Sequence, residues 1–200
     1  MKLDQFTYLY PENPRLLHID SELFKRINDD PNWIAERKYN ESRLMLHAWE
    51  GCRFEFWNRH NEKFNYIPSA DLQVALEKLP LKGYCIFDGG LRHNKTIGVK
   101  NQVIIYDMYA WNSQLLLDTP FKLRRSMNED LFMIDDYPIS LPPQFANVDF
   151  KSVFECVIKE PEIEGLVLKN LNGKIAPGRK ARLDSKWMYK LRQPSGRYKF

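Results

Sequence analysis

The sequence predicts an α+β fold in which antiparallel β-sheets are flanked by helices. Short apolar and aromatic runs recur along the chain and a few helical patterns lie among them, without the regular βαβ alternation of a parallel sheet. With 200 residues, 44% of them hydrophobic, the chain can bury a substantial core. We expect a single domain over residues 1–200, because no segment has the composition of a linker.

Capping residues and side-chain periodicity predict the elements of the first half. In chain order they are a helix from Asp20 to about Asn28 that ends before Pro31, strands at 34–39, 43–49 and 53–57, and a helix that starts at Ser69 and stops at Pro80. Leu72, Leu76 and Leu79 recur at helical spacing within the last element.

In the second half, strands and helices are predicted by the same criteria. They are strands at 84–87 and 102–111, a helix from Pro120 to about Met127 with Thr119 as its N-cap, a helix at 150–159, and strands at 163–169 and 187–192. Gly89 and Gly90 are expected to mark a turn after the first of these strands. Val153, Phe154 and Val157 form the apolar stripe that indicates the second helix.

Targeting segments and metal-binding spacings are not evident in the sequence. No apolar run approaches the ~20 residues of a membrane span, and the first residues lack a secretory pattern. We therefore expect a cytoplasmic protein with no membrane partner. Cys52, Cys85 and Cys156 are too widely spaced to suggest zinc or a disulfide framework, and we expect buried thiols.

Positive charge is concentrated at the C-terminal end. The net charge is +4 overall, but residues 174–200 carry nine basic residues against the single acid Asp184, which gives +8 there and −4 elsewhere. A basic segment on a mildly acidic body is typical of a surface that meets phosphates, in nucleic acid or in a nucleoside triphosphate. A solvated tail is the alternative.

Strand alternation groups charged residues on shared faces. In an extended 34–39 segment, Glu36 and Lys38 point to the same side, and in 187–192 Lys190 and Arg192 do the same. An exposed charge pattern would give the same spacing. The sequence thus predicts either two solvated faces or two walls of a charged site.

Two further strands carry residues whose direction is less regular. Glu164 and Lys169 are five residues apart, so they share a face only if the strand is irregular near Gly165. Tyr106 lies in an otherwise apolar run, where its ring serves either the core or a stacking surface.

Taken in order, several segments resemble the motifs of the nucleotidyltransferase core of the ATP-dependent polynucleotide (DNA and RNA) ligases, in the superfamily of covalent nucleotidyltransferases that includes mRNA capping enzymes. They are KYNESR at 38–43, FDGG at 87–90, IIYD at 104–107, EGLVLK at 164–169 and KLR at 190–192. FWNRHNEKF, at 56–64, resembles a further short segment that carries an arginine, here Arg59. The resemblance spans about Glu36 to Arg192 and implies an ATP-grasp-like ligase adenylation core with no C-terminal OB barrel.

The resemblance implies a lysine nucleophile, Lys38. Its amine would attack the α-phosphorus of ATP and expel pyrophosphate; the AMP would pass from the lysine to a nucleic acid 5′-phosphate, and a 3′-hydroxyl would displace it. An attacking lysine must be uncharged, and because its ordinary pKa is about 10.4, nearby cations or a metal are needed to lower that pKa.

The resemblance also implies roles for other residues. Glu36 would face the adenine amino group, Tyr106 would stack on the base, Arg43 and Arg59 would contact the sugar–phosphate end, Lys169, Lys190 and Arg192 would bind the α-phosphate, and Glu164 would bind Mg²⁺ or Mn²⁺. Each position also has a structural alternative, namely a surface ion pair, a core ring or a solvated strand edge.

The chain departs from the family pattern at two places. Asn40 and Glu41 stand where the family has aspartate and glycine, and Gly90 stands where the family has the acid that contacts ribose hydroxyls. Asp88 or Arg92 would be the substitutes for that acid.

The leading hypothesis is therefore an ATP-dependent ligase that joins 5′-phosphate and 3′-hydroxyl ends of nucleic acid. DNA is slightly favoured, because the spacing of Glu36, Lys38 and Arg43 matches DNA ligases and Arg59 fits as well. An RNA ligase is the alternative, and a guanylyltransferase is less favoured. A non-catalytic nucleotide- or nucleic-acid-binding module is the alternative of another class. The basic tail, a helper protein or an N-terminal segment would perform the work of the barrel that we expect to be missing.

Overall fold

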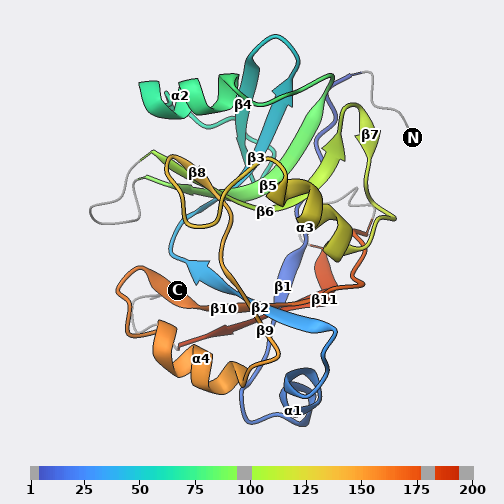
Figure 1. The fold of residues 1–200 in the computed structure, drawn as a ribbon, viewed down its shortest axis with the longest axis vertical. Coiled ribbons are helices and arrows are strands. Elements are labelled where there is room, and N and C mark those ends of the chain that lie inside the picture. The colour runs from blue at the N-terminus through green and yellow to red at the C-terminus, as the bar shows by residue number, and fades with distance from the viewer. Residues whose placement is uncertain (1–4, 94–100, 177–182, 194–200) are drawn as a thin grey trace.

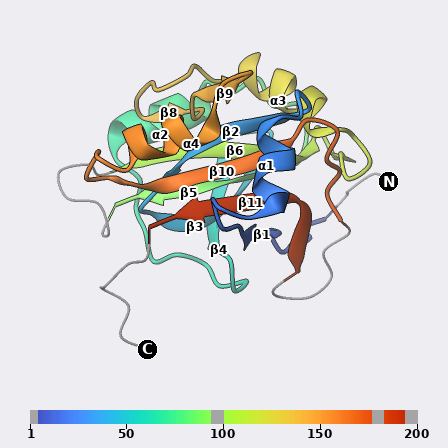
Figure 2. The same cartoon turned by 90° about the horizontal axis from the view of Figure 1, so that it is seen from below.

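Two β-sheets stacked against each other form the centre of the molecule (Figure 1). The structure is a computed structural model that describes residues 5–93, 101–176 and 183–193. Seen from below, the five-stranded sheet lies in front of the six-stranded sheet (Figure 2). The prediction of an α+β fold built mainly on antiparallel sheets is confirmed.

The strand that contains Lys38 lies in the interior of the five-stranded sheet. Its order is β1 (Asn13–Leu16), β11 (Asp184–Arg192), β10 (Ile163–Asn170), β2 (Trp33–Tyr39) and β9 (Gln144–Ala146). β1 runs parallel to β11, and the other neighbours are antiparallel.

The six-stranded sheet has the order β4 (Arg53–Asn58), β3 (Ser42–Trp49), β5 (Cys85–Arg92), β6 (Gln102–Trp111) and β7 (Gln114–Leu115), and β8 (Ile139–Ser140) pairs in parallel with β6. Ile34 and Met188 from the first sheet pack with Met45, Ile86 and Tyr109 from this one, so a hydrophobic core joins the two sheets. The following residue on β2, Ala35, packs into a different core beneath the five-stranded sheet, as strand alternation predicts.

Three of the described helices cover the outer faces of the sheets, and the fourth contributes to the core between them. α1 (Glu22–Asn28) and α4 (Phe150–Val157) pack their apolar residues on the five-stranded sheet, and α2 (Ala70–Glu77) packs Leu72 and Leu76 on the six-stranded sheet (Figure 1). α3 (Phe121–Glu129) inserts Phe121 into the core between the sheets.

Helix starts agree with the sequence in part. Ser69 caps α2 as predicted, through a hydrogen bond from the Leu72 backbone N–H. α1 is capped by Ser21 rather than Asp20, and Pro120 rather than Thr119 takes the cap position of α3. Both errors are of one residue: at α1 the neighbouring Asp20 and Ser21 are both capping residue types, and at α3 Pro120 takes the cap position without a side-chain hydrogen bond.

One prediction about the six-stranded sheet is wrong. Gly89 and Gly90 form no turn; β5 continues through both to Arg92. A Cβ at Gly89 would lie 2.4 Å from the backbone oxygen of Ile104, so this glycine allows a close approach of β6 instead. The short strands β1, β7, β8 and β9 were also not predicted.

The predictions for the cysteines and for the basic C-terminal segment can also be compared with the structure. Cys85 is buried as expected, but Cys52 and Cys156 are exposed, because they lie in a turn and on the outer side of α4. Lys180 and Arg182, which carry part of the basic C-terminal charge, lie outside the described residues. None of the helices in the described part of the chain has the length and hydropathy needed to cross a bilayer.

Candidate nucleotide site

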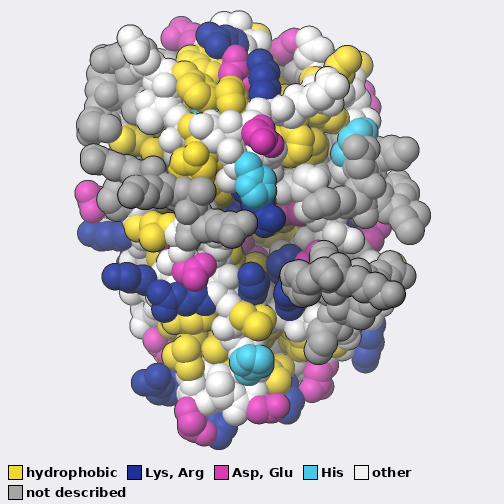
Figure 3. Space-filling view, turned by 180° about the vertical axis from the view of Figure 1, so that it is seen from behind, with side chains coloured by type: hydrophobic (Ala, Val, Ile, Leu, Met, Phe, Trp, Pro, Cys, Tyr) yellow, Lys and Arg dark blue, Asp and Glu magenta, His cyan; other side chains and the backbone are white. Residues whose placement is uncertain are grey.

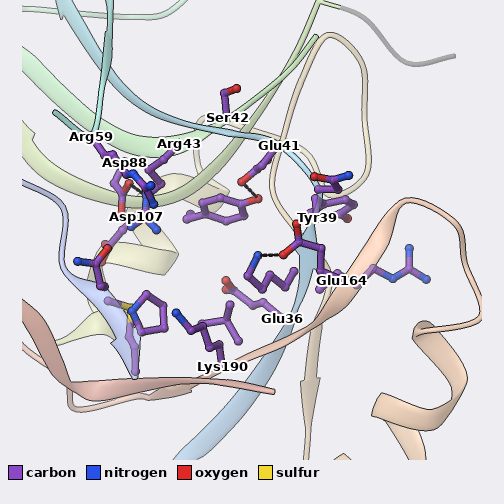
Figure 4. Close-up of a pocket in the computed structure, with 18 of the residues that line it drawn as sticks. Glu36, Tyr39, Glu41, Ser42, Arg43, Arg59, Asp88, Asp107, Glu164 and Lys190 are labelled. Atoms are coloured by element: carbon purple, nitrogen blue, oxygen red, sulfur yellow. Dashed lines mark hydrogen bonds and ion pairs between the residues drawn. The ribbon is translucent and has the colours of Figure 1, made fainter. Parts of the chain in front are cut away.

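A cavity of about 480 Å³ opens between the two sheets and gathers the predicted site residues. All nine of them line it: Lys38, Glu36, Arg43, Arg59, Tyr106, Glu164, Lys169, Lys190 and Arg192. Figure 4 shows Arg43 and Asp88 on one side of the cavity and Glu36 and Lys190 facing them from the other. The residues expected to share a site from motif order alone are therefore close together in space.

Lys38 and Glu164 contact each other directly. β2 and β10 are antiparallel neighbours, Lys38 pairs with Gly165, and the register shifts between Ile163 and Gly165. This irregularity, which the sequence suggested at Gly165, turns Glu164 toward the cavity beside Lys38. The Lys38 ammonium donates to the Glu164 carboxylate. About a quarter of each side chain remains exposed, 25% and 24% respectively. Figure 4 labels Glu164 among the cavity residues.

Glu36 lies deeper and is enclosed by basic and amide groups. Its side chain is 1% exposed. Lys169 Nζ lies 2.6 Å from Glu36 Oε2, Arg125 Nη1 lies 3.3 Å from Oε1, and Gln144 Nε2 donates to Oε1 at 2.9 Å. Oε1 thus accepts hydrogen bonds, whereas Oε2 is ion-paired with Lys169 and has no hydrogen bond among the described residues. Sequence reasoning missed Arg125 and Gln144, since neither an arginine in a helix nor a glutamine at the start of a short, unpredicted strand gives a local signal of this contact.

Arg43 is fixed by a buried carboxylate on the neighbouring strand. Its guanidinium donates two hydrogen bonds to Asp88, which the pairing of β3 with β5 places close to it. Burial raises the pKa of Asp88, and the Arg43 guanidinium acts in the opposite direction. Both oxygens of the Asp88 carboxylate, a candidate substitute for the missing acid, therefore pair with Arg43. Arg92, the other candidate substitute for the missing acid, is bonded to Gln102 and Glu162 and is not among the described residues that line the cavity.

Tyr106 projects from β6 into the cavity wall. Its hydroxyl donates to a Glu41 carboxyl oxygen, and its backbone oxygen accepts from Lys169 Nζ at 2.9 Å. Val167 and Met188, from the facing sheet, also line the cavity. An aromatic ring on one sheet and aliphatic side chains on the other form the walls of a slot that suits a flat base.

The remaining predicted cations surround the cavity from two sides. Arg59 and Arg192 are exposed, and Lys190 is partly buried. Burial, followed by the nearby charges of Arg192 and Lys38, lowers the pKa of Lys190. On the face seen in Figure 3, Lys and Arg side chains gather across the middle of the molecule. This arrangement is suited to phosphate groups.

Asp107 follows Tyr106 and is used structurally. Arg124 of α3, with 0% of its side chain exposed, donates to both Asp107 oxygens at 2.7 and 2.8 Å. This pair fixes α3 against β6 at the wall of the cavity, which Asp107 also lines. Among the described residues, no group of three or more His, Cys, Asp or Glu side chains could hold a metal ion by itself.

Comparison with known proteins supports the fold and leaves the chemistry open. No protein-family model matches the chain, and no curated protein sequence matches it. Solved structures do match. A mycobacterial DNA ligase D complexed with ATP and MES has a TM-score of 0.62 at 19% identity, over 80% of this chain and 54% of that one.

Two further ligase structures match similarly. The ligase domain of LigD from M. tuberculosis has a TM-score of 0.58 at 20% identity, over 80% of this chain and 53% of that one. A structure from a study of Lig E DNA ligases has a TM-score of 0.59 at 18% identity, over 91% and 68% of the two chains. The chain spans about half the length of the first two matches. The fold is thus that of the nucleotidyltransferase domain of ATP-dependent DNA ligases, as the motif order predicted.

Proposed function

We propose that this protein is an ATP-dependent nucleotidyltransferase that adenylylates its own Lys38 and passes the AMP to a 5′-phosphate end of nucleic acid for joining to a 3′-hydroxyl, with DNA the favoured substrate. One observation carries the proposal: nine residues dispersed between positions 36 and 192 line a single cavity, where Lys38 contacts Glu164. The likeness to DNA ligase structures supports DNA over RNA.

Lys38 contacts the partly exposed Glu164 carboxylate at the cavity wall, whereas the other cavity lysine in contact with a carboxylate, Lys169, is buried against Glu36. The amine must lose a proton before it attacks, and the Glu164 carboxylate in contact with it is placed to take that proton. A Lys38 Nζ–phosphorus bond then forms as the bond from the α-phosphorus to the bridging oxygen breaks, and pyrophosphate leaves. Lys190 and Arg192 would balance the negative charge that develops on the phosphate oxygens.

Glu164 also suits a divalent cation. It presents one partly exposed carboxylate to the cavity, and the Lys38 ammonium now occupies the position of a cation beside it. Mg²⁺ is commonly held by one or two protein carboxylates together with substrate phosphates. When bound, Mg²⁺ would neutralise charge on the phosphate groups. Opening of the Lys38–Glu164 pair would free the amine and the carboxylate together.

The base would lie in the slot between Tyr106 and the side chains of Val167 and Met188. If Glu36 contacted the adenine amino group, that group would have to share a carboxylate oxygen with a residue already bound to it. One oxygen accepts from Arg125, and the other pairs with Lys169. We therefore infer that Glu36 serves mainly to hold Lys169 toward the phosphates.

The test is covalent labelling. The protein is incubated with Mg²⁺ and ATP labelled at the α-phosphate, and label that stays with the denatured chain is measured and located by peptide mass spectrometry. Wild type should carry AMP on Lys38, and Lys38→Ala and Lys38→Arg should carry none. Lys151→Ala, which changes an exposed lysine on α4, is the matched control and should label like wild type.

The outcomes separate the hypotheses. ATP binding without a covalent adduct would favour a non-catalytic nucleotide-binding module and refute adenylylation. If the adduct forms, nicked DNA and nicked RNA are offered to the labelled protein. Faster sealing of RNA would overturn the preference for DNA and favour the RNA ligase alternative.

A further inference from the structure

Glu41 occupies space that exists only because residue 90 is glycine. The turn between β2 and β3 places the Glu41 carboxyl against Gly90 of β5. A Cβ built on Gly90 would lie 1.7 Å from Glu41 Oε2 and 2.0 Å from Oε1. Any other residue at position 90 would therefore displace this carboxyl. The acid expected at position 90 is absent, but a carboxyl from a neighbouring turn stands at the same point.

The two oxygens of Glu41 are not equally satisfied. One accepts a hydrogen bond from the Tyr106 hydroxyl. Oε2 is buried and has no hydrogen-bond partner among the described residues, although Glu41 lines the cavity. A buried polar atom without a partner is destabilising, and such atoms are uncommon in native proteins unless water or a ligand satisfies them. Figure 4 shows the Glu41 side chain among the cavity residues.

We propose that Glu41 binds the sugar hydroxyl groups of the nucleotide and so makes the site prefer ribonucleoside over deoxyribonucleoside triphosphates. The inference rests on the proposed function. Glu41 contacts Tyr106, the proposed base-stacking ring, and is three residues from Lys38, the proposed phosphate-attacking amine. In a nucleotide the sugar lies between the base and the α-phosphate, so the group between these two residues faces the sugar.

Hydroxyl groups also fit the chemistry of this carboxyl. Burial raises the pKa of Glu41 to about 8, while the Tyr106 hydrogen bond and the charges of Lys38 and Arg43 act in the opposite direction. The group is thus near the point where it changes protonation state. A hydroxyl can both donate and accept, and therefore pairs with either form, whereas a phosphate oxygen would pair only with the protonated form.

The experiment compares nucleotides that differ by one hydroxyl. Binding of ATP, 2′-deoxy-ATP and 3′-deoxy-ATP is measured by calorimetry on wild type, Glu41→Ala and the exchange variant Glu41→Gly with Gly90→Glu. Wild type should bind at least one deoxy analogue about tenfold more weakly than ATP, which is the effect of one hydrogen bond to a carboxyl group. Glu41→Ala should bind all three nearly equally, and the exchange variant should recover part of the preference.

Two further variants guard against a general loss of structure. Glu50→Ala changes an exposed glutamate in the next hairpin turn and should keep the wild-type preference. Gly90→Ala leaves Glu41 in the sequence but displaces its carboxyl, so it should reduce the preference even if Glu41→Ala folds poorly.

The inference fails separately from the proposed function. If wild type binds ATP and forms the lysyl adduct but binds the deoxy analogues equally well, Glu41 does not read the sugar. The same conclusion follows if Glu41→Ala or Gly90→Ala, folded by its melting curve, keeps the full preference. If wild type binds no ATP, the proposed function is refuted and the inference with it.

Discussion

Replacing Gly165 with alanine should destabilise the five-stranded sheet and disturb the candidate site at the same time. Gly165 has φ +148°, a region that favours glycine. A Cβ at this position would lie 2.0 Å from the backbone oxygen of Leu191, whereas such contacts essentially never fall below 3.0 Å. The obstacle is backbone, so no side-chain rotation relieves it.

The magnitude follows from the pairing of β10 with β11. These strands, normally about 4.8 Å apart, would have to separate by about 1 Å beside Gly165, which pairs with Arg192. Loss of two ladder hydrogen bonds at about 1 kcal/mol each, added to about 1–2 kcal/mol for alanine at positive φ, predicts a decrease of about 3–4 kcal/mol in the free energy of unfolding.

Gly51 provides a matched control. It also has positive φ, +81°, but a Cβ there meets nothing within 4 Å. Gly51→Ala should therefore carry only the backbone term of about 1–2 kcal/mol. Both variants are unfolded in urea and followed by circular dichroism, and labelling of Lys38 is measured on each folded protein. Labelling should fall only in Gly165→Ala, because Gly165 adjoins Glu164 and pairs with Lys38.

Equal stability losses for the two glycine variants would refute this reasoning. That result would mean that the β10–β11 contact adapts to the added methyl group without losing hydrogen bonds. Unchanged labelling in a destabilised Gly165→Ala would separate the sheet from the site and refute the link to Glu164.

Three other predictions can be tested by urea unfolding. Arg124→Met should lower the free energy of unfolding by about 3–5 kcal/mol, because it leaves the Asp107 carboxylate buried without its partner, whereas Arg26→Met on the surface of α1 should change it by less than about 1 kcal/mol. Burial lowers the pKa of His47 to about 3, so the unfolded chain binds a proton that the folded chain does not, and stability should fall as pH falls from about 6.5 toward 3; His47→Asn should flatten this decline. The pKa of Glu41 is raised by burial to about 8, so stability should fall as pH rises from about 4.5 toward 8, and a decline that persists in Glu41→Gln would contradict this assignment.

Local pattern was sufficient for most of the elements. The spacing of the leucines and the capping residue Ser69 predicted α2. Strand alternation predicted that Glu36 and Lys38 lie on the same side of β2, and both line the cavity. The turn predicted at Gly89 and Gly90 is wrong, because glycine is equally suited to a turn and to a position where another backbone segment approaches closely. Only the packed sheets show that Gly89 admits the backbone of β6 and that Gly90 admits Glu41.

The order of the motifs and strand periodicity together determined which residues line the cavity, since a short strand fixes the direction of each side chain. The partners of those residues were decided by tertiary structure. Arg125 reaches Glu36 across 89 positions of sequence, and Tyr106 reaches Glu41 across 65. Such contacts depend on how α3, β2 and β6 pack against one another. A local pattern of residues does not encode which residues distant in the sequence meet in this way. The sequence by itself therefore specified the catalytic candidates, whereas the stacking of the two sheets decided what holds them and which carboxyl replaces the missing acid.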